Sequence, residues 1–373
     1  MRVLFDHTIF LNQRFGGISR YFFELMESSS KLGLDFKVFS PFYRNEYLDE
    51  KNPKNYLKKK VNTNNRYLNY LLDIGLDFGE SFYSLQNKPD LIHRTFYTGR
   101  RSFYFNKAPH VLTIYDLIHE LFEYYEPPYR KGWKNKERSI YAADFFLCIS
   151  ENTKKDLLDI YDLDPDRVFV TKLGVNHNTF NPFTSNPDKF DSTGIPSKFI
   201  LFVGWRKWYK NFLNLLKAFS LIHSTHQEIN LVCYGGGDFD VDELRLIKSF
   251  GLSHKIFHIS GDDSLLSDLY SRAELFVYPS MYEGFGLPPL EAMACGCPVV
   301  SSSAGSLNEI LKDAPIYIEN VNEPDSIAKS LEAVLSSDEL KRNLISNGIS
   351  LSKKYSWKNC AMDTIESYSK ILT

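Results

Sequence analysis

The sequence predicts an α/β protein built from two doubly wound, Rossmann-like domains. The chain has 373 residues, about twice the usual domain size of roughly 100–200 residues. Short runs of β-branched and aromatic residues alternate with segments of helical period, which is typical of βαβ units and a parallel sheet. A polar, proline-containing stretch at residues 176–197 interrupts this alternation, and we interpret it as a linker between two domains.

In the first half, six apolar runs are the expected strands, and segments of helical period lie between several of them. The expected strands cover residues 3–5, 35–39, 91–93, 111–115, 145–149 and 168–173. The expected helices cover residues 18–27, 67–83 and 151–161. Ser150 is a suitable N-cap for the third helix, because its hydroxyl can accept a backbone hydrogen bond there. No clear period covers residues 41–60.

After the linker the alternation starts again. The expected strands cover residues 199–203, 229–234, 256–259, 275–278, 298–301 and 316–318. The expected helices cover residues 211–223, 242–250, 265–271, 289–294, 326–335, 339–353 and 357–372. We therefore expect domains at residues 1–180 and 181–354, followed by a C-terminal helix at 355–373. Doubly wound sheets bind ligands at the carboxyl ends of their strands, so the site is expected in a cleft between the two domains.

The composition excludes several classes of protein. A hydrophobic fraction of 43% with 15% aromatic residues is too high for a disordered chain. The formal net charge of −2 gives no basic excess of the kind that binds nucleic acid. The five cysteines are scattered, which predicts buried, reduced thiols in the cytoplasm. Apolar runs stay shorter than the roughly 18 residues that a membrane span needs.

The most specific motif is Glu-Gly-Phe-Gly-Leu-Pro-Pro-Leu-Glu at residues 283–291. Gly284 and Gly286 let the backbone approach a ligand closely. One of the two prolines suits the first position of a helix, so the helix would begin here. Its N–H groups and the positive end of its dipole would face the ligand. A phosphate group is the natural guest of such a turn.

The two carboxylates of this motif fit two different tasks. Glu291 would lie in the first turn of the helix, where a carboxylate can accept the hydroxyl hydrogens of a ribose, as it does in dinucleotide folds. That leaves Glu283, before the turn, for the hydroxyls of a sugar. The alternative for Glu291 is that it only complements the helix dipole.

A basic loop follows the expected strand at residues 199–203. Arg206, Lys207 and Lys210 lie there before the next helix, where a pyrophosphate would rest at the end of the strand. Such cations can neutralise a departing diphosphate without a metal ion. The alternative is an ordinary solvated loop.

The pair Gly16-Gly17 follows the first expected strand and opens a helix. Its backbone amides are placed to bind a phosphate from the opposite wall of the cleft. The sequence around the pair matches neither the Gly-x-Gly-x-x-Gly dinucleotide pattern nor the P-loop pattern. NAD-dependent and ATP-hydrolysing chemistry are therefore disfavoured.

Together these motifs resemble the family 4 glycosyltransferases of the GT-B fold, and the resemblance covers nearly the whole chain. The motifs that carry it are Gly16-Gly17, Gly204 with Arg206 and Lys210-Asn211, Glu283-x7-Glu291, and the run Ala-Met-Ala-Cys-Gly-Cys-Pro-Val at residues 292–299. The forms Phe-Gly-Gly-Ile-Ser-Arg-Tyr and Tyr-Lys-Asn-Phe are similar to those of bacterial enzymes that assemble O-antigen and other lipopolysaccharide chains.

The resemblance implies a hexosyltransferase, of a mannosyltransferase-like kind, that uses a nucleoside diphosphate sugar, retains the anomeric configuration and needs no metal or other cofactor. It implies an N-terminal acceptor domain, a C-terminal donor domain, and a final helix that crosses back to the N-terminal domain. The implied donor-binding residues are Gly16, Gly17, Gly204, Arg206, Lys210, Gly284, Phe285, Gly286, Leu287 and Glu291, with Glu283 on the donor hexose. The implied acceptor is a glycan or a polyprenyl-linked oligosaccharide.

One position departs from the family pattern. Many members carry a His-Asp pair after a strand of the N-terminal domain, whereas this chain has Tyr115 followed by Asp116. His119 comes three residues further on. Asp116 and His119 are therefore the candidates in this domain for a catalytic role, although the departing phosphate itself can take the acceptor proton in a retaining transfer.

Four alternatives remain beside this interpretation. Asp238-Phe-Asp240 has the Asp-x-Asp pattern of metal-dependent GT-A enzymes, but its place before a helix favours capping. The same fold also serves disaccharide synthases and phosphorylases, or a non-catalytic partner that binds a nucleotide sugar. Finally, the five lysines among residues 51–60 either solvate a loop or bring a cytoplasmic enzyme to the inner face of the membrane.

Overall fold

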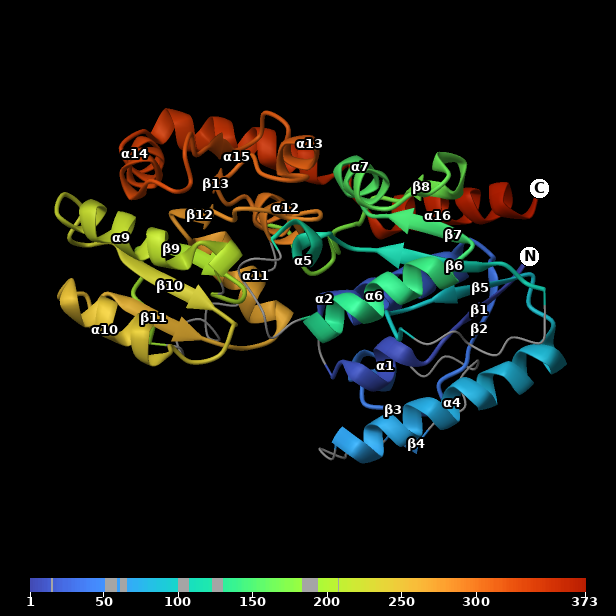
Figure 1. Cartoon of the computed structure of the whole chain (residues 1–373). Helices are drawn as coiled ribbons and strands as arrows, with labels where there is room; N and C mark the ends of the chain where they lie inside the picture. The colour runs from blue at the N-terminus through green and yellow to red at the C-terminus, as the bar shows by residue number, and fades with distance from the viewer. Residues whose placement is uncertain are drawn as a thin grey trace. The chain divides into compact units, whose positions relative to one another are not determined.

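The chain forms two compact units, and one of them is discontinuous in sequence (Figure 1). The computed structural model describes residues 1–14, 16–50, 59–60, 66–99, 107–122, 130–182, 194–206 and 208–373. The first unit is Met1–Leu173 with Trp357–Thr373, and the second is Gly174–Ser356. The boundary expected after residue 180 therefore lies at Gly174. An isolated bridge between Val175 and Ser356 joins the two ends of the second unit.

The first unit is built on a six-stranded sheet in which all pairings are parallel. The strand order is β2-β1-β5-β6-β7-β8. The bounds are β1 Arg2–Phe5, β2 Asp35–Val38, β5 Leu91–Arg94, β6 His110–Ile114, β7 Phe145–Cys148 and β8 Val168–Val170. All six match the expected runs, because each carries apolar side chains that are buried in the unit.

Helices connect these strands. They are α1 Thr8–Asn12, α2 Gly17–Lys31, α3 Tyr47–Glu50, α4 Arg66–Asn87, α5 Ile118–Leu121, α6 Arg130–Ala142 and α7 Glu151–Ile160. The unit also contains a pair of short strands, β3 Phe42–Tyr43 and β4 Lys59–Lys60, and a 3-10 turn at Pro165–Arg167. Ser150 caps α7 by accepting the Thr153 N–H at 3.0 Å, as predicted. Helix α6 was not expected, since its charged sequence has few apolar positions from which to recognise a period.

The second unit repeats this architecture with a six-stranded parallel sheet in the order β11-β10-β9-β12-β13-β14. The strands are β9 Phe199–Val203, β10 Asn230–Tyr234, β11 Ile256–Ile259, β12 Leu275–Tyr278, β13 Val299–Ser301 and β14 Ile316–Tyr317. The helices are α9 Phe212–His223, α10 Val241–Ser249, α11 Asp263–Arg272, α12 Leu287–Ala294, α13 Leu307–Leu311, α14 Pro324–Leu335 and α15 Asp338–Ser352. A 3-10 turn, Trp208–Lys210, precedes α9. Two Rossmann-like units confirm the predicted fold class.

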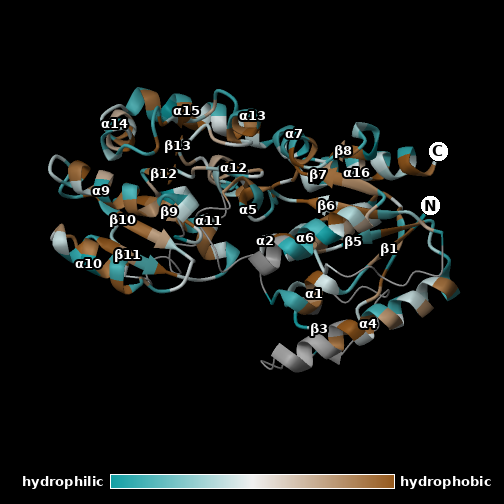
Figure 2. Cartoon of the chain, in the orientation of Figure 1, coloured by the Kyte–Doolittle hydropathy of each residue, from teal (hydrophilic) through white to brown (hydrophobic). Residues whose placement is uncertain are grey.

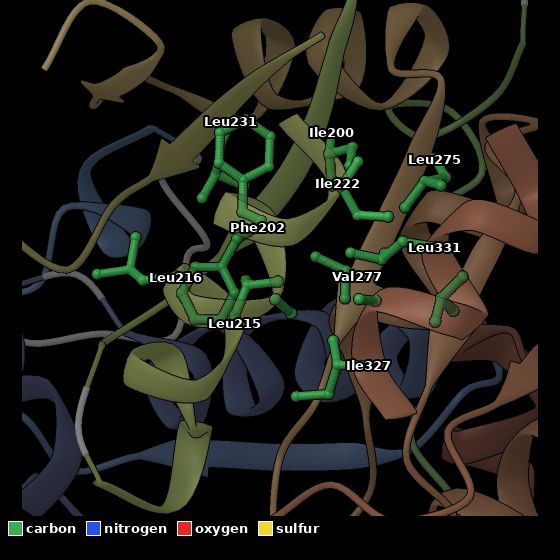
Figure 3. Close-up of a cluster of buried hydrophobic side chains, with 14 of the residues drawn as sticks. Ile200, Phe202, Leu215, Leu216, Ile222, Leu231, Leu275, Val277, Ile327 and Leu331 are labelled. Carbon is green, nitrogen blue, oxygen red and sulfur yellow. The ribbon is translucent and has the colours of Figure 1, made fainter. Parts of the chain in front are cut away.

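The core of the second unit lies between its sheet and the helices α9 and α14. Figure 3 shows Phe202 of β9, Leu215 of α9, Val277 of β12 and Ile327 of α14 among the side chains gathered there. Burying each such side chain contributes about 1.5–3 kcal/mol. Figure 2 shows a hydropathy pattern that fits this packing. Strand β10 is hydrophobic, whereas α9 and α14 carry both hydrophobic and hydrophilic residues.

The cysteines belong to these cores. All five are free and buried, as predicted. Among the described helices, none combines the length and the apolar character that crossing a lipid bilayer requires.

The last helix, α16 Trp357–Leu372, belongs to the first unit and contacts α2 there. The Tyr368 hydroxyl lies 2.5 Å from Nδ1 of His93 in β5, and His93 Nε2 lies 2.8 Å from the Thr113 hydroxyl. Burial lowers the pKa of His93 to about 3, so the ring is neutral at pH 7. A neutral ring can accept a hydrogen bond from the Tyr368 hydroxyl at Nδ1 and donate one to the Thr113 hydroxyl from Nε2. The helix is thereby tied to the middle of the sheet.

Replacing Tyr368 by phenylalanine tests this connection. We expect Tyr368→Phe to lower the free energy of unfolding by about 1–3 kcal/mol, because it leaves a buried ring nitrogen without its hydrogen bond. The measurement is urea denaturation. Lys370→Ala on the same helix is the control, since it removes only a surface ion pair with Glu366 and should leave the midpoint unchanged. Equal midpoints for the two variants would contradict the role given to Tyr368.

Candidate active site

The glycine-rich turn of the 283–291 motif leads directly into α12. Gly286 is the N-cap with a φ of 100°, a left-handed conformation that favours glycine. Leu287 is the first helical residue, and the two prolines follow it rather than opening the helix. Since proline has no N–H, Leu287 carries the one backbone donor among the first three helical positions. This end of α12 therefore offers its dipole and few N–H groups to an anion.

Because α12 begins at Leu287, Glu291 has a later position in the helix than the sequence predicted. It is the fifth residue of α12, and the first turn contains no acidic residue. The expectation that Glu291 lies in the first turn is wrong, because the helix begins before the prolines. Glu291 is buried, with 6% of its surface exposed. Its distance from the first turn weakens the alternative that it serves only the helix dipole, whose effect fades beyond that turn.

The loop after β13 contacts the backbone of Glu283. The Glu283 carbonyl oxygen accepts hydrogen bonds from both the backbone N–H and the hydroxyl of Ser306, each at 3.0 Å. Gly305 has a φ of +59°, and a Cβ there would come within 2.5 Å of the same oxygen. Sequence reasoning missed these two residues. The run of small residues that follows β13 was the available signal.

Lys210 meets Glu283 although the two lie on different loops. The Lys210 ammonium donates to Oε1 of Glu283 at 2.6 Å and to the Tyr278 hydroxyl at 2.8 Å. It also lies 5.2 Å from the ring centre of Tyr209 and 4.8 Å from that of Tyr278, within cation–π range. The loops are joined directly, because the Met281 N–H donates to the Tyr209 carbonyl at 2.7 Å. Two motifs recognised separately in the sequence thus form one cluster.

Arg206 is engaged elsewhere in the same unit. Its Nε donates to Glu243 at 2.9 Å, and its two terminal nitrogens donate to the carbonyls of Gly235, Gly237 and Asp238 at 2.7–3.1 Å. Four of the five guanidinium N–H groups are thus directed at protein acceptors. Arg206 therefore organises the glycine loop after β10, and its expected contact with a pyrophosphate stays a prediction. Lys207 lies outside the described residues.

The Asp-x-Asp sequence is a capping structure at its second aspartate. Asp240 is the N-cap of α10 and accepts the N–H groups of Asp242 and Glu243, both at 2.9 Å. The Glu243 carboxylate accepts a hydrogen bond from the Asp240 N–H at 2.8 Å, which completes a capping box. The Asp238 side chain is fully exposed and lies 3.4 Å from Nδ1 of His258. The capping interpretation of Asp240 is confirmed.

In the first unit, α2 begins at Gly17 with Gly16 as its N-cap. Gln13 accepts the Ser19 N–H at 3.2 Å, so a side chain already serves part of this helix end. A Cβ on Gly17 would meet nothing within 4 Å, whereas a Cβ on Gly16 would collide with Gln13. The backbone at Gly17 is therefore open to an approaching group. Its expected contact with a phosphate stays a prediction.

The segment after β6 holds the other candidates of the first unit. The Tyr115 hydroxyl donates to the Thr95 carbonyl at 3.2 Å inside the unit, and burial raises the pKa of Tyr115 well above its usual value. Asp116 accepts the Ile118 N–H at 3.2 Å, and its carbonyl accepts from Lys136. His119 is exposed on α5. The catalytic roles expected for Asp116 and His119 stay predictions.

A buried ionic cluster at the carboxyl ends of β1 and β5 was not foreseen. Arg94 lies 3.0 Å from Asp6 and 3.4 Å from Glu80. Burial alone would raise the pKa of Asp6, but Arg94 and other partners outweigh it and lower that pKa. His7, Asp77 and Glu80 also bring potential metal-ligating atoms within 4.8 Å of one another. Arg94 supplies the positive charge of the cluster and joins the end of β5 to Asp6, which follows β1. We therefore interpret the cluster as a structural link between these two strand ends.

The folds of solved structures agree with this architecture. The structure of Anabaena Alr3699/HepE in complex with UDP-glucose has a TM-score of 0.76 at 15% identity and covers 99% of each chain. The structure of WaaG, a glycosyltransferase involved in lipopolysaccharide biosynthesis, has a TM-score of 0.71 at 18% identity and covers 100% of this chain and 99% of that one. Two Rossmann-like units of this kind define the GT-B class of proteins.

Sequence comparison assigns the family within that class. A family model described as "Glycosyl transferases group 1" matches residues 185–351, and one described as "Glycosyltransferase Family 4" matches residues 15–179. The O-antigen chain mannosyltransferase B of Escherichia coli is 30% identical over 265 residues, which cover 69% of this chain and 69% of that protein. The chain belongs to the family 4 glycosyltransferases, and the predicted resemblance and enzyme class are confirmed.

The packing of Gly305 against Glu283 makes a testable prediction. We expect Gly305→Ala to lower the free energy of unfolding by about 1–3 kcal/mol, as overpacking does, and to reduce glycosyl transfer at least tenfold, since about 1 Å of misplacement is sufficient for such a loss. Gly251→Ala is a matched control, because Gly251 has a φ of +69° with no atom within 4 Å of the added Cβ. Urea denaturation measures the effect on stability, and a transfer assay measures the effect on activity. Equal transfer in both variants would contradict the prediction.

Proposed function

We propose that the chain is a retaining, metal-independent glycosyltransferase. In this proposal it moves a hexose from a nucleoside diphosphate sugar to a glycan or polyprenyl-linked acceptor during surface polysaccharide assembly of the O-antigen kind. The observation that carries the proposal is the cluster of Lys210, Glu283 and the start of α12 within one unit, where a cation, a carboxylate and a helix dipole lie together. The similarity to an O-antigen chain mannosyltransferase supports this substrate class.

Each residue of the cluster has a role in the proposal. Lys210 and the N-terminal end of α12 bind the diphosphate, with Gly284, Phe285 and the backbone of Leu287 beside it. Glu283 accepts hydrogen bonds from the hydroxyls of the hexose, and Glu291 accepts those of the ribose. Arg206 acts on this site by holding the glycine loop after β10, in addition to any contact with phosphate. Positive charge beside the diphosphate stabilises it as it leaves.

The reaction breaks the bond between the anomeric carbon and the phosphate oxygen and forms a bond from that carbon to the acceptor oxygen on the same face. The proton of the acceptor hydroxyl passes to the departing phosphate oxygen, so no dedicated protein base is required. Gly16, Gly17, Asp116 and His119, in the first unit, are proposed to act on the phosphate and on the donor sugar. The first unit is proposed to bind the acceptor.

We propose mannose as the transferred hexose, because the E. coli relative is named a mannosyltransferase. A UDP-hexose is the alternative, since the Anabaena protein of the same fold binds UDP-glucose. The enzyme is proposed to act in the cytoplasm at the inner membrane face, with the lysines of residues 51–60 as the contact. Most of that segment lies outside the described residues.

The first test is a thermal shift assay with GDP, UDP, dTDP and ADP, each with and without EDTA. We expect one diphosphate to raise the melting temperature equally in both conditions, since a ligand of the native state stabilises by about 2.7 kcal/mol at 100 times its Kd. GDP would identify the proposed mannosyl donor. No shift with any diphosphate, or a shift that EDTA removes, would count against the proposal.

The second test separates the two carboxylates. We expect Glu283→Ala to abolish transfer with the fold retained, and Glu291→Ala to weaken nucleotide binding at least tenfold, as losing a bidentate contact of about 1.4–3 kcal/mol would do. Calorimetry and a transfer assay measure the two effects. Glu274→Ala is the control, because it removes an acidic residue of the same unit that pairs with Lys341 away from the cluster. Unchanged turnover in Glu283→Ala would exclude its proposed role.

A further inference from the structure

The proposed function gives Lys210 and Glu283 to two different parts of the donor, yet the structure pairs them with each other. Their charged atoms are 2.6 Å apart, and the side chains are only 12% and 11% exposed. Within the described residues, Lys210 is the cation that pairs with this carboxylate. A ligand that takes one partner therefore acts on the other.

Loss of the ion pair affects Lys210 and Glu283 differently. Lys210 has other favourable contacts at hand, because the Tyr278 hydroxyl accepts from it at 2.8 Å and two aromatic rings lie within 5.2 Å. Burial, followed by the charge of Glu283, keeps the pKa of Tyr278 well above its usual value, so its phenol stays neutral. Glu283 has its backbone carbonyl held by the N–H and the hydroxyl of Ser306, which opposes movement of the loop toward water. An unpaired carboxylate in a buried position is strongly unfavourable.

A free nucleoside diphosphate and an intact sugar donor therefore affect the pair differently. The diphosphate draws Lys210 away and brings nothing to Glu283, whereas the donor brings hexose hydroxyls that can replace the ammonium as hydrogen-bond partners of the carboxylate. We propose that the Lys210–Glu283 ion pair makes the enzyme discriminate against the free nucleoside diphosphate in favour of the intact sugar donor. This inference rests on the proposed function and deepens it, since the same pair would favour release of the product diphosphate.

The test is calorimetric binding of GDP and GDP-mannose, or of UDP and UDP-glucose if the wild-type enzyme binds that pair instead. We expect Glu283→Gln to bind the diphosphate at least about tenfold tighter, because binding no longer leaves a buried carboxylate unpaired, and the sugar donor at least about threefold weaker, because an amide accepts hydrogen bonds less strongly than a carboxylate. Glu274→Gln is the matched control. It breaks another 2.6 Å ion pair of the same unit, with Lys341, and should change neither affinity.

A second background separates the ion pair from the general effect of removing a negative charge near an anion. In Lys210→Met enzyme, Glu283→Gln should no longer increase diphosphate affinity. If the increase persists there, or if Glu283→Gln binds the diphosphate as weakly as wild type does, the inference is overturned. Should the melting curve show that Glu283→Gln is unfolded, Glu283→Asp replaces it, since a shorter side chain withdraws the carboxylate from Lys210 and should also tighten diphosphate binding.

Failure of this inference is distinct from failure of the proposed function. Wild-type enzyme that binds a diphosphate and transfers sugar, but whose selectivity does not depend on Glu283, contradicts only the role of the ion pair. Wild-type enzyme that binds none of the four diphosphates contradicts the proposed function itself.

Discussion

The reversal of strand order between β9 and β12 is the constraint on which the site depends. These two strands pair in parallel at the middle of the second sheet, with β10 on one side and β13 on the other. Loops that follow neighbouring parallel strands leave the same edge of the sheet, and ligands of such folds bind where the strand order reverses. Lys210 follows β9 and Glu283 follows β12, so their meeting is a consequence of topology. In the first unit the same reversal lies between β1 and β5, where Asp6 and Arg94 are found.

Much of this organisation could be predicted from the sequence because it depends on local pattern. Apolar runs of strand length predicted all twelve strands of the two main sheets, since a strand inside a parallel sheet must be hydrophobic on both faces. The spacing within residues 283–291 similarly predicted a turn that leads into a helix. The carboxyl ends of parallel strands lie at the same edge of a sheet. This rule is sufficient to place Lys210, after β9, and Glu283, after β12, at one edge.

The remainder depends on contacts between distant segments, which no local pattern encodes. The basic loop predicted Arg206 as a ligand for phosphate, but it did not predict the hydrogen bonds of Arg206 to the loop after β10. The position of Glu291 changed because Leu287, rather than a proline, opens α12. Tyr278 gave no signal of its own, because a tyrosine within a strand is common, and the only signal for Gly305 was the run of small residues that contains it. Their importance comes from the atoms that the fold brings near them.

The discontinuous first unit determines the order in which the protein can be completed during synthesis. The second unit is a single stretch of chain, so all of its residues have been made before Trp357 is added. The first unit lacks α16 until the whole of the second unit has been translated. Until then, Tyr21 lacks the ring of Trp357, and His93 lacks the hydroxyl of Tyr368. The first unit can therefore finish folding only after the second unit has been synthesised, and removing α16 would expose apolar surface to chaperones and proteases.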